Sequence, residues 1–371
     1  MINIMVDASL YIPIYFIVVT LFTLGVASKI KTKSASQILE YGNTSAIAGT
    51  LLFSLIIAVF LGSRPPTYYF GDTGNYAHHF YLIKDGLIPN IPSSEWLWIK
   101  LITICTKITD VNGFLTIVAI GYLGFTATAC AKIAPRHSLA LLLFNMGAYS
   151  FIGYGVNGLR NGLACSIMLL VIALAIQDRP KRLLAIAIAV LASCVHKTVI
   201  LPLSMLVISL YFIRNFKTAY IFWIFSIILS LTVGGTISSF FGLLGFDDRL
   251  SYLTNEVNAE KFSHTGFRFD FLLYSMMPII LGYHIIIKKG LRNRAYEILL
   301  NTYTLSNAFW VIVIRAEFSN RFAYLSWFLY PIVLAYPALK MNVWGKKQGI
   351  VAAKILMAQL GFTLFMEFIV S

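Results

Sequence analysis

Long apolar runs, separated by short polar or basic segments, dominate this sequence. A transmembrane helix needs about 20 apolar residues, or fewer where the helix is buried inside protein. The runs therefore predict an all-α fold: a polytopic transmembrane helical bundle, in which one membrane domain covers residues 1–371. We expect about twelve helices, at 10–27, 46–62, 113–131, 138–153, 158–177, 183–195, 198–213, 219–237, 268–287, 295–314, 322–339 and 350–369.

The composition agrees with this pattern and excludes other classes of protein. Hydrophobic residues make up 58% of the chain and charged residues 12%. Soluble domains are about 45–50% apolar and about 25% charged. A water-soluble globular protein and a disordered chain are therefore excluded. The net charge of +14 would suggest a nucleic-acid partner in a soluble protein, but in a membrane protein the positive-inside rule is the first explanation.

The positions of the charges test that explanation. With the N-terminus outside, the predicted inside loops hold 18 of the 29 basic residues and 3 of the 15 acidic ones. The basic excess therefore orients the protein in the bilayer, and we expect no nucleic-acid partner. The same count favours a helical hairpin for the two short runs 183–195 and 198–213, with one broken helix as the alternative. Both termini are then outside.

Two outside segments, about 63–112 and 238–267, are longer than the others, and we expect both to contribute to a site. Within the first, residues 94–108 have the pattern of an amphipathic helix at the membrane interface. Ser93 or Ser94 is the expected N-cap of this helix, and Glu95 falls in its first turn.

Ionisable residues gather at the predicted outer helix ends. Such groups are costly at membrane depth and usually line a cavity, although long side chains also extend to the lipid headgroups. Arginine suits a diphosphate because its planar fork is always charged. Together with many Tyr and Trp residues and apolar grooves, this pattern points to a lipid-pyrophosphate-linked sugar. The ionisable residues at the predicted outer helix ends are Asp72, Glu95, Arg160, His196, Lys197, Arg249, Arg268, Arg315 and Arg321.

The stretch 69–80 contains the first candidate group. Asp72 and Tyr76 are four residues apart, so a helix that starts here places both on one face. The alternative is an Asp that only caps a loop helix. The adjacent His78 and His79 would point apart on a helix, so we expect no metal site there.

Three further stretches carry charge at helix ends. Arg160, between Gly158 and Gly162, predicts an anion site at a helix N-terminus, and the glycines also fit close helix packing. His196 beside Lys197 is suited to phosphate binding or acid–base work, or is satisfied by a neighbouring carbonyl. In the last stretch Arg321 and Tyr324 are one turn apart, and Arg315 either joins them or pairs with Glu317 at the surface.

These stretches carry a resemblance to a known family: GDTGNYAHHF, GLRNGLACSIMLL, HKTVILPLS and SNRFAYLSWFLYP. In composition and in order along the chain they resemble the EpsG family, bacterial multi-pass proteins that look like Wzy-type polysaccharide polymerases. The chain departs from the family at Arg160-Asn161, where relatives often carry Arg-Gln.

The resemblance implies a GT-C-like glycosyltransferase of the bacterial cytoplasmic membrane. It would join oligosaccharide repeat units linked to undecaprenyl pyrophosphate, on the periplasmic or outer face, into O-antigen, capsule or exopolysaccharide. The activated pyrophosphate is the leaving group, so no nucleotide sugar is needed and we expect no cofactor. A diphosphate can recruit a divalent ion, but the outside acids form no clear ligand cluster, so we expect metal-independent catalysis. A chain-length regulator and a flippase of the same pathway are the partner candidates, and the protein is expected to be embedded in the lipid bilayer.

Residue roles follow from that chemistry, which needs a base at one end and fixed positive charge at the other. Asp72 is the first candidate for the base, by analogy with an early outside-loop acid in GT-C enzymes, and Glu95 the second, with His196 as a further acid–base group. The remaining groups would bind the pyrophosphate or the glycan: Arg160, Lys197, Arg249, Arg268, Arg315, Arg321, Tyr76, Tyr252 and Tyr324.

Four other functions remain as alternatives. A transporter or flippase predicts charges through the bilayer midplane and matching halves, and the sequence has neither pattern. A membrane acyltransferase would need a buried His with a nearby acid inside a span. A non-catalytic assembly partner is a third alternative. A ligase that transfers finished glycan shares the polymerase chemistry and is not separated from it by sequence.

Overall fold

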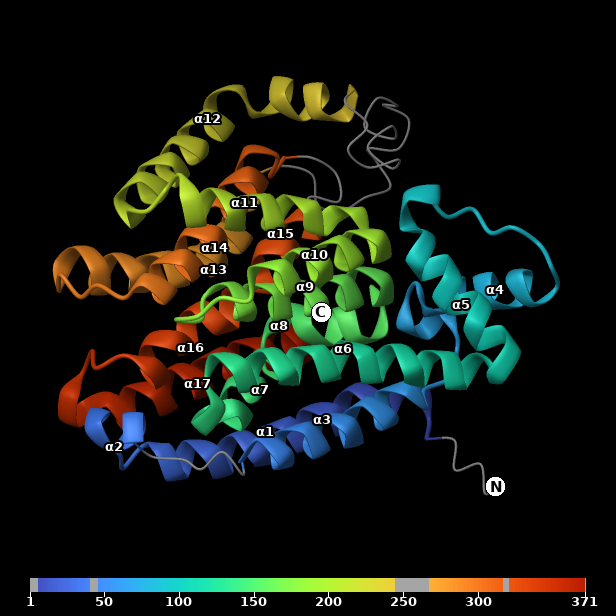
Figure 1. Ribbon diagram of the computed structural model, residues 1–371, viewed down its shortest axis with the longest axis horizontal. Coiled ribbons are helices and arrows are strands. Elements are labelled where there is room, and N and C mark those ends of the chain that lie inside the picture. Colours follow the sequence, from blue (N-terminus) through green and yellow to red (C-terminus); the bar gives the residue numbers. More distant parts are fainter. Residues whose placement is uncertain (1–5, 41–45, 244–266, 316–319, 371) are drawn as a thin grey trace. The chain divides into compact units, whose positions relative to one another are not determined.

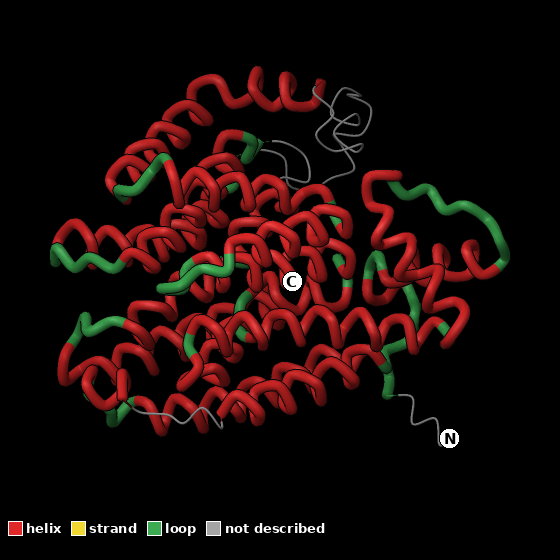
Figure 2. Tube along the Cα trace, in the orientation of Figure 1, coloured by secondary structure: helices red, strands yellow, loops and turns green. Residues whose placement is uncertain are grey.

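The computed structural model describes residues 6–40, 46–243, 267–315 and 320–370, without the side chains of 234–243 and 320–321. Within these ranges all regular secondary structure is helical and none is strand (Figure 2). The all-α class predicted from the apolar runs is therefore confirmed.

The chain consists of two compact units. The first contains Met1–Ile200 and Ala335–Ser371, and the second contains Leu201–Leu334. The single membrane domain stays a prediction.

Long apolar helices build the first unit. Pairs that pack together are α3 with α6, α6 with α9, α9 with α10, and α1 with α17 (Figure 1). Each helix is apolar on most of its surface, which is typical of helices in a membrane or in a large core. Their bounds are α1 Tyr11–Ile30, α3 Ala46–Gly62, α6 Val111–Ile133, α9 Leu159–Ala175, α10 Arg182–Val195 and α17 Gln348–Phe365, with a short α2 at Ala35–Glu40.

Between α3 and α6 the chain forms two shorter helices, α4 (Thr73–Lys84) and α5 (Trp96–Ile108). The helix expected at 94–108 is confirmed, but the Ser93 or Ser94 cap is wrong. A 3-10 turn over Ser93–Glu95 precedes α5, and Pro92 stands before that turn. Glu95 is the N-cap residue of α5 and its side chain makes no capping hydrogen bond, because the carboxylate is used elsewhere.

The span expected at 138–153 is wrong as one helix. It consists of α7 (Ser138–Met146) and α8 (Tyr149–Val156), bent by 79°. Carbonyls freed at a bend are costly in an apolar environment. Side chains of α1 and α17 satisfy three of them: Tyr15 donates to Met146 O (2.7 Å), Gln359 to Phe144 O (2.5 Å) and Thr363 to Gly147 O (2.8 Å). The bend fixes the direction in which α8 leads to the start of α9.

The second unit contains α11 to α15 and the start of α16. Polar side chains join its helices: Trp223 of α12 donates to Asn307 of α14 (2.8 Å), and Trp327 of α15 donates to Ser275 of α13 (2.6 Å). The bounds are α11 Ile200–Tyr211, α12 Phe216–Leu243, α13 Phe269–Gly282, α14 Arg294–Ile312, α15 Asn320–Trp327 and α16 Tyr330–Lys340.

Within the described ranges, six helices are long and apolar enough to cross a membrane, or seven if α7 and α8 form one span. Four shorter apolar helices add to them. The chain is therefore a membrane protein, while the count of about twelve spans stays a prediction. The expected break between 183–195 and 198–213 is present, because α10 ends at Val195 and His196 is extended. The hairpin itself stays a prediction.

Candidate active site

The carboxylate of Glu95 lies at the centre of a buried polar cluster in the first unit. Glu95 is 0% exposed. Its Oε2 contacts Nη1 of Arg160 at 2.5 Å, and its Oε1 pairs with Nδ1 of His196. The backbone N–H of Lys197 also donates to Oε1, at 3.4 Å. The structure thus brings together residues that are far apart in sequence, from the start of α5, the start of α9 and the end of α10.

The partners of Glu95 keep it ionised. Burial raises the pKa of Glu95, but the hydrogen bond and charge of His196, the charge of Arg160 and the Lys197 N–H lower it by more. The net pKa lies below the usual value of a glutamate. Nδ1 of His196 contacts this carboxylate, so the alternative of a carbonyl partner does not describe that ring nitrogen.

The Arg160 guanidinium has N–H donors that no described residue pairs with. Its side chain is 18% exposed, and only Nη1 has a partner among the described residues. The buried Nε has no hydrogen-bond partner there. Arg160 is the second residue of α9, where backbone N–H groups also favour an anion. One edge of the guanidinium is therefore held by Glu95 while other donors remain for a ligand.

Close packing at the start of α9 holds Arg160 in place. A Cβ at Gly162 would lie 2.7 Å from the carbonyl oxygen of Tyr154, so the glycine permits the contact between α8 and α9. Asn161 adds polar contacts, since it donates to Tyr154 Oη (3.2 Å) and accepts from Thr198 (3.3 Å). The expected close packing of the glycines is therefore present. The anion site at Arg160 stays a prediction.

The loop that carries Asp72 is fastened to the turn between α8 and α9. The Asp72 N–H donates to Oδ1 of Asn157 (2.8 Å), and the Thr73 hydroxyl donates to the carbonyl of Val156. Gly71 has φ +60°, and a Cβ there would lie 2.5 Å from Oδ1 of Asn157. The contact therefore requires glycine for both its backbone conformation and its size.

The Asp72 carboxylate is partly exposed and accepts a hydrogen bond from Asn75 at 3.0 Å. Asp72 occupies the N-cap position of α4 but makes no side-chain capping bond. The capping alternative therefore does not describe this side chain. The helix expected to begin here is confirmed, and Tyr76 packs edge-on against Trp98 with ring centroids 5.5 Å apart.

Arg64 supports this arrangement, and sequence reasoning missed it. It is 0% exposed and donates to Leu61 O (2.6 Å), Thr73 Oγ1 (3.0 Å) and Val156 O (3.3 Å). Burial lowers its pKa to about 10. Its place directly after an apolar run resembles an ordinary interfacial arginine, so only the fold shows that it joins the Asp72 loop to α8.

The other predicted site residues belong to the second unit or lie outside the described residues. Arg268 forms two hydrogen bonds with Asp270 (2.9 and 2.6 Å) and lies over the Phe271 ring. Arg315 donates to the carbonyl of Ser230 at 3.3 Å. Tyr324 packs on Trp327. Arg249, Tyr252 and the side chain of Arg321 lie outside the described residues.

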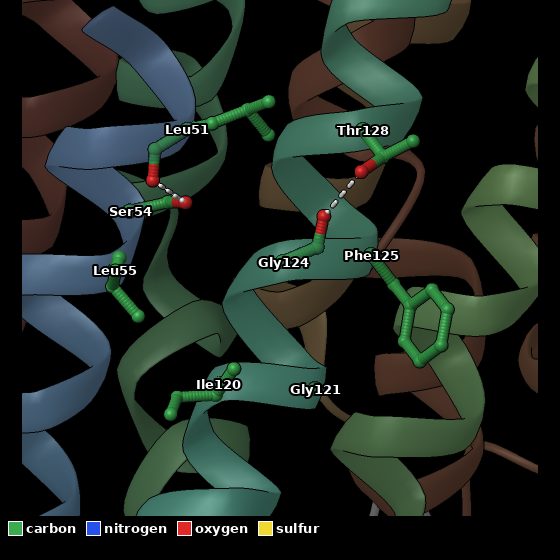
Figure 3. A pocket seen from close by; sticks show the side chains of 8 residues that line it. All are labelled: Leu51, Ser54, Leu55, Ile120, Gly121, Gly124, Phe125 and Thr128. Carbon is green, nitrogen blue, oxygen red and sulfur yellow. Dashed lines mark hydrogen bonds between the residues drawn. The ribbon is translucent and has the colours of Figure 1, made fainter. Parts of the chain in front are cut away.

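An open groove with a volume of about 370 Å³ lies between α3 and α6. Figure 3 shows its lining, in which Gly121 and Gly124 leave space between the larger apolar side chains. No lining residue is charged, so this groove suits hydrocarbon and not a diphosphate. The lining residues are Leu51, Ser54, Leu55, Ile120, Gly121, Gly124, Phe125 and Thr128.

No group of three or more His, Cys, Asp or Glu residues within the described ranges could hold a metal ion. The metal-free site stays a prediction.

Among protein families, the model of the EpsG family matches residues 47–371. That range includes the second unit, the first unit from residue 47 onward, and every residue of the Glu95 cluster. Neither the curated proteins nor the solved structures give a match.

Proposed function

Because the chain belongs to the EpsG family, which is associated with Wzy-type polysaccharide polymerases, we propose that it polymerises lipid-linked repeat units. Membership of this family supports a membrane protein of the polysaccharide polymerase-like class. The finer proposal is a GT-C-like glycosyltransferase that acts on undecaprenyl-pyrophosphate-linked glycans at the periplasmic or outer face. The growing glycan is the donor and a single lipid-linked repeat is the acceptor.

The observation that supports this proposal is the guanidinium of Arg160, in which Nη1 is paired with Glu95 while other N–H donors are left for a ligand. A buried carboxylate holds Nη1, so the group is fixed in position before substrate arrives. Preorganised positive charge is most effective where negative charge develops in the transition state. A departing diphosphate is such a place, and arginine binds it through two parallel hydrogen bonds.

The proposed reaction is one displacement at the anomeric carbon of the donor sugar. A hydroxyl oxygen of the acceptor forms the new bond to that carbon. The bond from the carbon to the phosphate oxygen breaks, and its electron pair leaves with undecaprenyl pyrophosphate. The hydroxyl proton passes to a base on the protein. No nucleotide sugar and no cofactor enter this balance.

Asp72 is better placed than Glu95 to be that base. Its carboxylate is partly exposed and has one hydrogen-bond donor, Asn75, among the described residues. Glu95 is buried and is neutralised by Arg160 and His196. In the proposal, Glu95 is therefore a positioning residue that orients Arg160 and His196, while Lys197 adds positive charge beside them.

The open apolar groove between α3 and α6 is consistent with a lipid-linked substrate, because its lining suits a hydrocarbon chain. The arginines of the second unit, Arg268 and Arg315, remain proposed contacts for the glycan or the diphosphate, as do Arg249 and Arg321.

Lipid-linked glycans from cells that lack the protein test the proposal. We expect single repeats to accumulate on the lipid carrier and polymer to disappear, and wild-type protein to restore polymer. If full-length polymer still forms but is not exported, the transporter alternative replaces the polymerase. If polymer forms but is not attached to its final acceptor, the ligase alternative replaces the polymerase.

A further inference from the structure

His79 lies on the same side of α4 as two predicted site residues. Positions 72, 76 and 79 are four and three residues apart, so they follow one side of the helix. On this side Tyr76 is only 8% exposed and packs against Trp98 of α5. α5 begins directly after Glu95. His79 is therefore on the side of α4 that faces the Glu95 cluster.

One ring nitrogen of His79 is buried without a partner. The residue is half-buried, and its Nδ1 has no hydrogen-bond partner in the part of the chain that the structure describes. Buried polar atoms in native proteins nearly always have a partner, from protein, water or a ligand. The neighbouring His78 differs, since its side chain is exposed and its ring centroid is 6.4 Å away.

The charges around His79 favour its neutral form. Burial lowers the pKa of His79 most, Arg160 of α9 and the adjacent His78 lower it further, and Asp72 raises it. The net direction is downward from the ordinary value of 6.5. From α5 the contact on this side is Trp98, which is uncharged. At neutral pH the ring therefore offers one donor and one acceptor, as a sugar hydroxyl also does.

We propose that His79 is a substrate-binding residue, whose ring forms a hydrogen bond with a glycan hydroxyl next to the diphosphate held by Arg160. This inference rests on the proposed function and adds to it a contact for the sugar. Arg160 binds the charged part of the substrate, and the neutral imidazole binds an uncharged part beside it. The pair would thus align the anomeric carbon, which is the sugar carbon bonded to the diphosphate oxygen.

The neighbouring histidine supplies a matched control for the mutational test. Each variant is expressed in the deletion strain, and membranes are prepared from these cells. Native lipid-linked repeats, extracted from the deletion strain without any variant, are added to the membranes. The initial rate of glycan chain growth is then measured. We expect His79→Phe, which keeps the ring but not the hydrogen bond, to lower kcat/KM about tenfold. His79→Gln, which restores a donor and an acceptor, recovers most of the loss. His78→Phe stays within about twofold of wild type.

The pH profile separates a contact with substrate from a structural role. In wild type the rate rises with pH through an acid limb below the ordinary histidine value of 6.5, since the neutral ring is the binding form. His79→Gln removes this limb and His78→Gln keeps it. A monodisperse size-exclusion profile for each variant confirms folding.

Three results would overturn the inference. Equal kcat/KM for His79→Phe and His78→Phe excludes a substrate contact at His79, and so does an unchanged acid limb in His79→Gln. Both leave the proposed function intact, because the wild-type protein extends chains. If wild-type membranes extend no chains, the proposed function fails and the His79 contact fails with it.

Discussion

At the residue scale, the charge balance of the proposed site depends on Glu95. It is the acid that pairs with both Arg160 and His196, and its side chain is 1% exposed. Removing one partner of a buried charge pair is far more damaging than removing a surface charge, because the remaining charge is left buried and unpaired. The stability of the first unit should therefore be sensitive to this carboxylate.

We predict that Glu95→Gln lowers the free energy of unfolding by roughly 3 kcal/mol. Gln keeps the size of Glu but not its charge. Thermal unfolding in detergent measures the change as a lower Tm. Glu40→Gln is the control, since Glu40 is exposed in α2, and it should change stability by less than about 0.5 kcal/mol. Equal Tm values for the two variants would contradict the buried pairing.

The same carboxylate predicts how stability changes with acid. The pKa of Glu95 in the folded protein lies below its ordinary value of 4.5. Its contribution is therefore complete above that ordinary value and is lost as the pH falls through the folded pKa. We expect the Tm of wild type to fall below pH 4.5 more steeply than that of Glu95→Gln. Parallel curves in this range would show that Glu95 does not titrate with folding.

At the scale of elements, the contact between the Asp72 loop and the α8–α9 turn sets the geometry of the site. Gly71 and Asn157 make this contact so close that a single methyl group does not fit. Arg64 and Thr73 hold the same two segments from the buried side. Displacement of the loop would move Asp72 relative to the start of α9, which carries Arg160.

We predict that Gly71→Ala lowers polymerase activity much more than Gly86→Ala. Both glycines have positive φ, +60° and +77°, so both variants carry backbone strain. At Gly71 the strain is larger than that of an ordinary left-handed residue, because its ψ of −125° lies outside the αL region. Only at Gly71 does the new methyl group meet another atom within 4 Å. Polymer yield per folded protein measures the difference. Similar yields for the two variants would show that the Asn157 contact is not needed for activity.

The helices of this protein were largely predictable, because long apolar runs report local hydropathy. The bend between α7 and α8 was not, since its carbonyls are satisfied by Tyr15, Gln359 and Thr363, which are more than 130 residues away along the chain in the first case and over 200 in the others. The cap of α5 was also wrong, because local capping rules do not include a distant partner for Glu95.

The site was predictable only as a set of charged outer helix ends. Sequence reasoning named Glu95, Arg160 and His196 separately, but their pairing depends on the packing of α5, α9 and α10. Arg64 and His79 were not assigned roles, because burial and an unpartnered nitrogen become visible only in the fold. The roles of Arg249, Tyr252 and Arg321 stay predictions.

At the scale of the whole molecule, the distribution of basic residues predicts which side of the membrane holds the Glu95 cluster. Basic clusters at 29–33, 179–182 and 288–294 belong to the predicted inside loops. The segment with Asp72 and Glu95 then lies outside, where lipid-linked repeats are polymerised in the proposed function.

We predict that a membrane-impermeant maleimide labels Lys84→Cys in intact cells and does not label Lys181→Cys. Lys84 ends α4, and Lys181 lies directly before α10. The four native cysteines are replaced first, since Cys194 is only partly buried. Labelling of Lys181→Cys in intact cells, without Lys84→Cys, would reverse the orientation and place the cluster inside.

The most direct measurement uses purified protein in lipid vesicles, supplied with native lipid-linked repeats from the deletion strain. Glycan length and released undecaprenyl pyrophosphate are measured together. We predict one released molecule for each repeat added, a rate roughly 100-fold lower for Arg160→Lys, and a rate within about twofold of wild type for the exposed control Arg179→Lys. Failure of the purified wild type to lengthen the glycan, or an unchanged rate in Arg160→Lys, would contradict a polymerase that acts through Arg160.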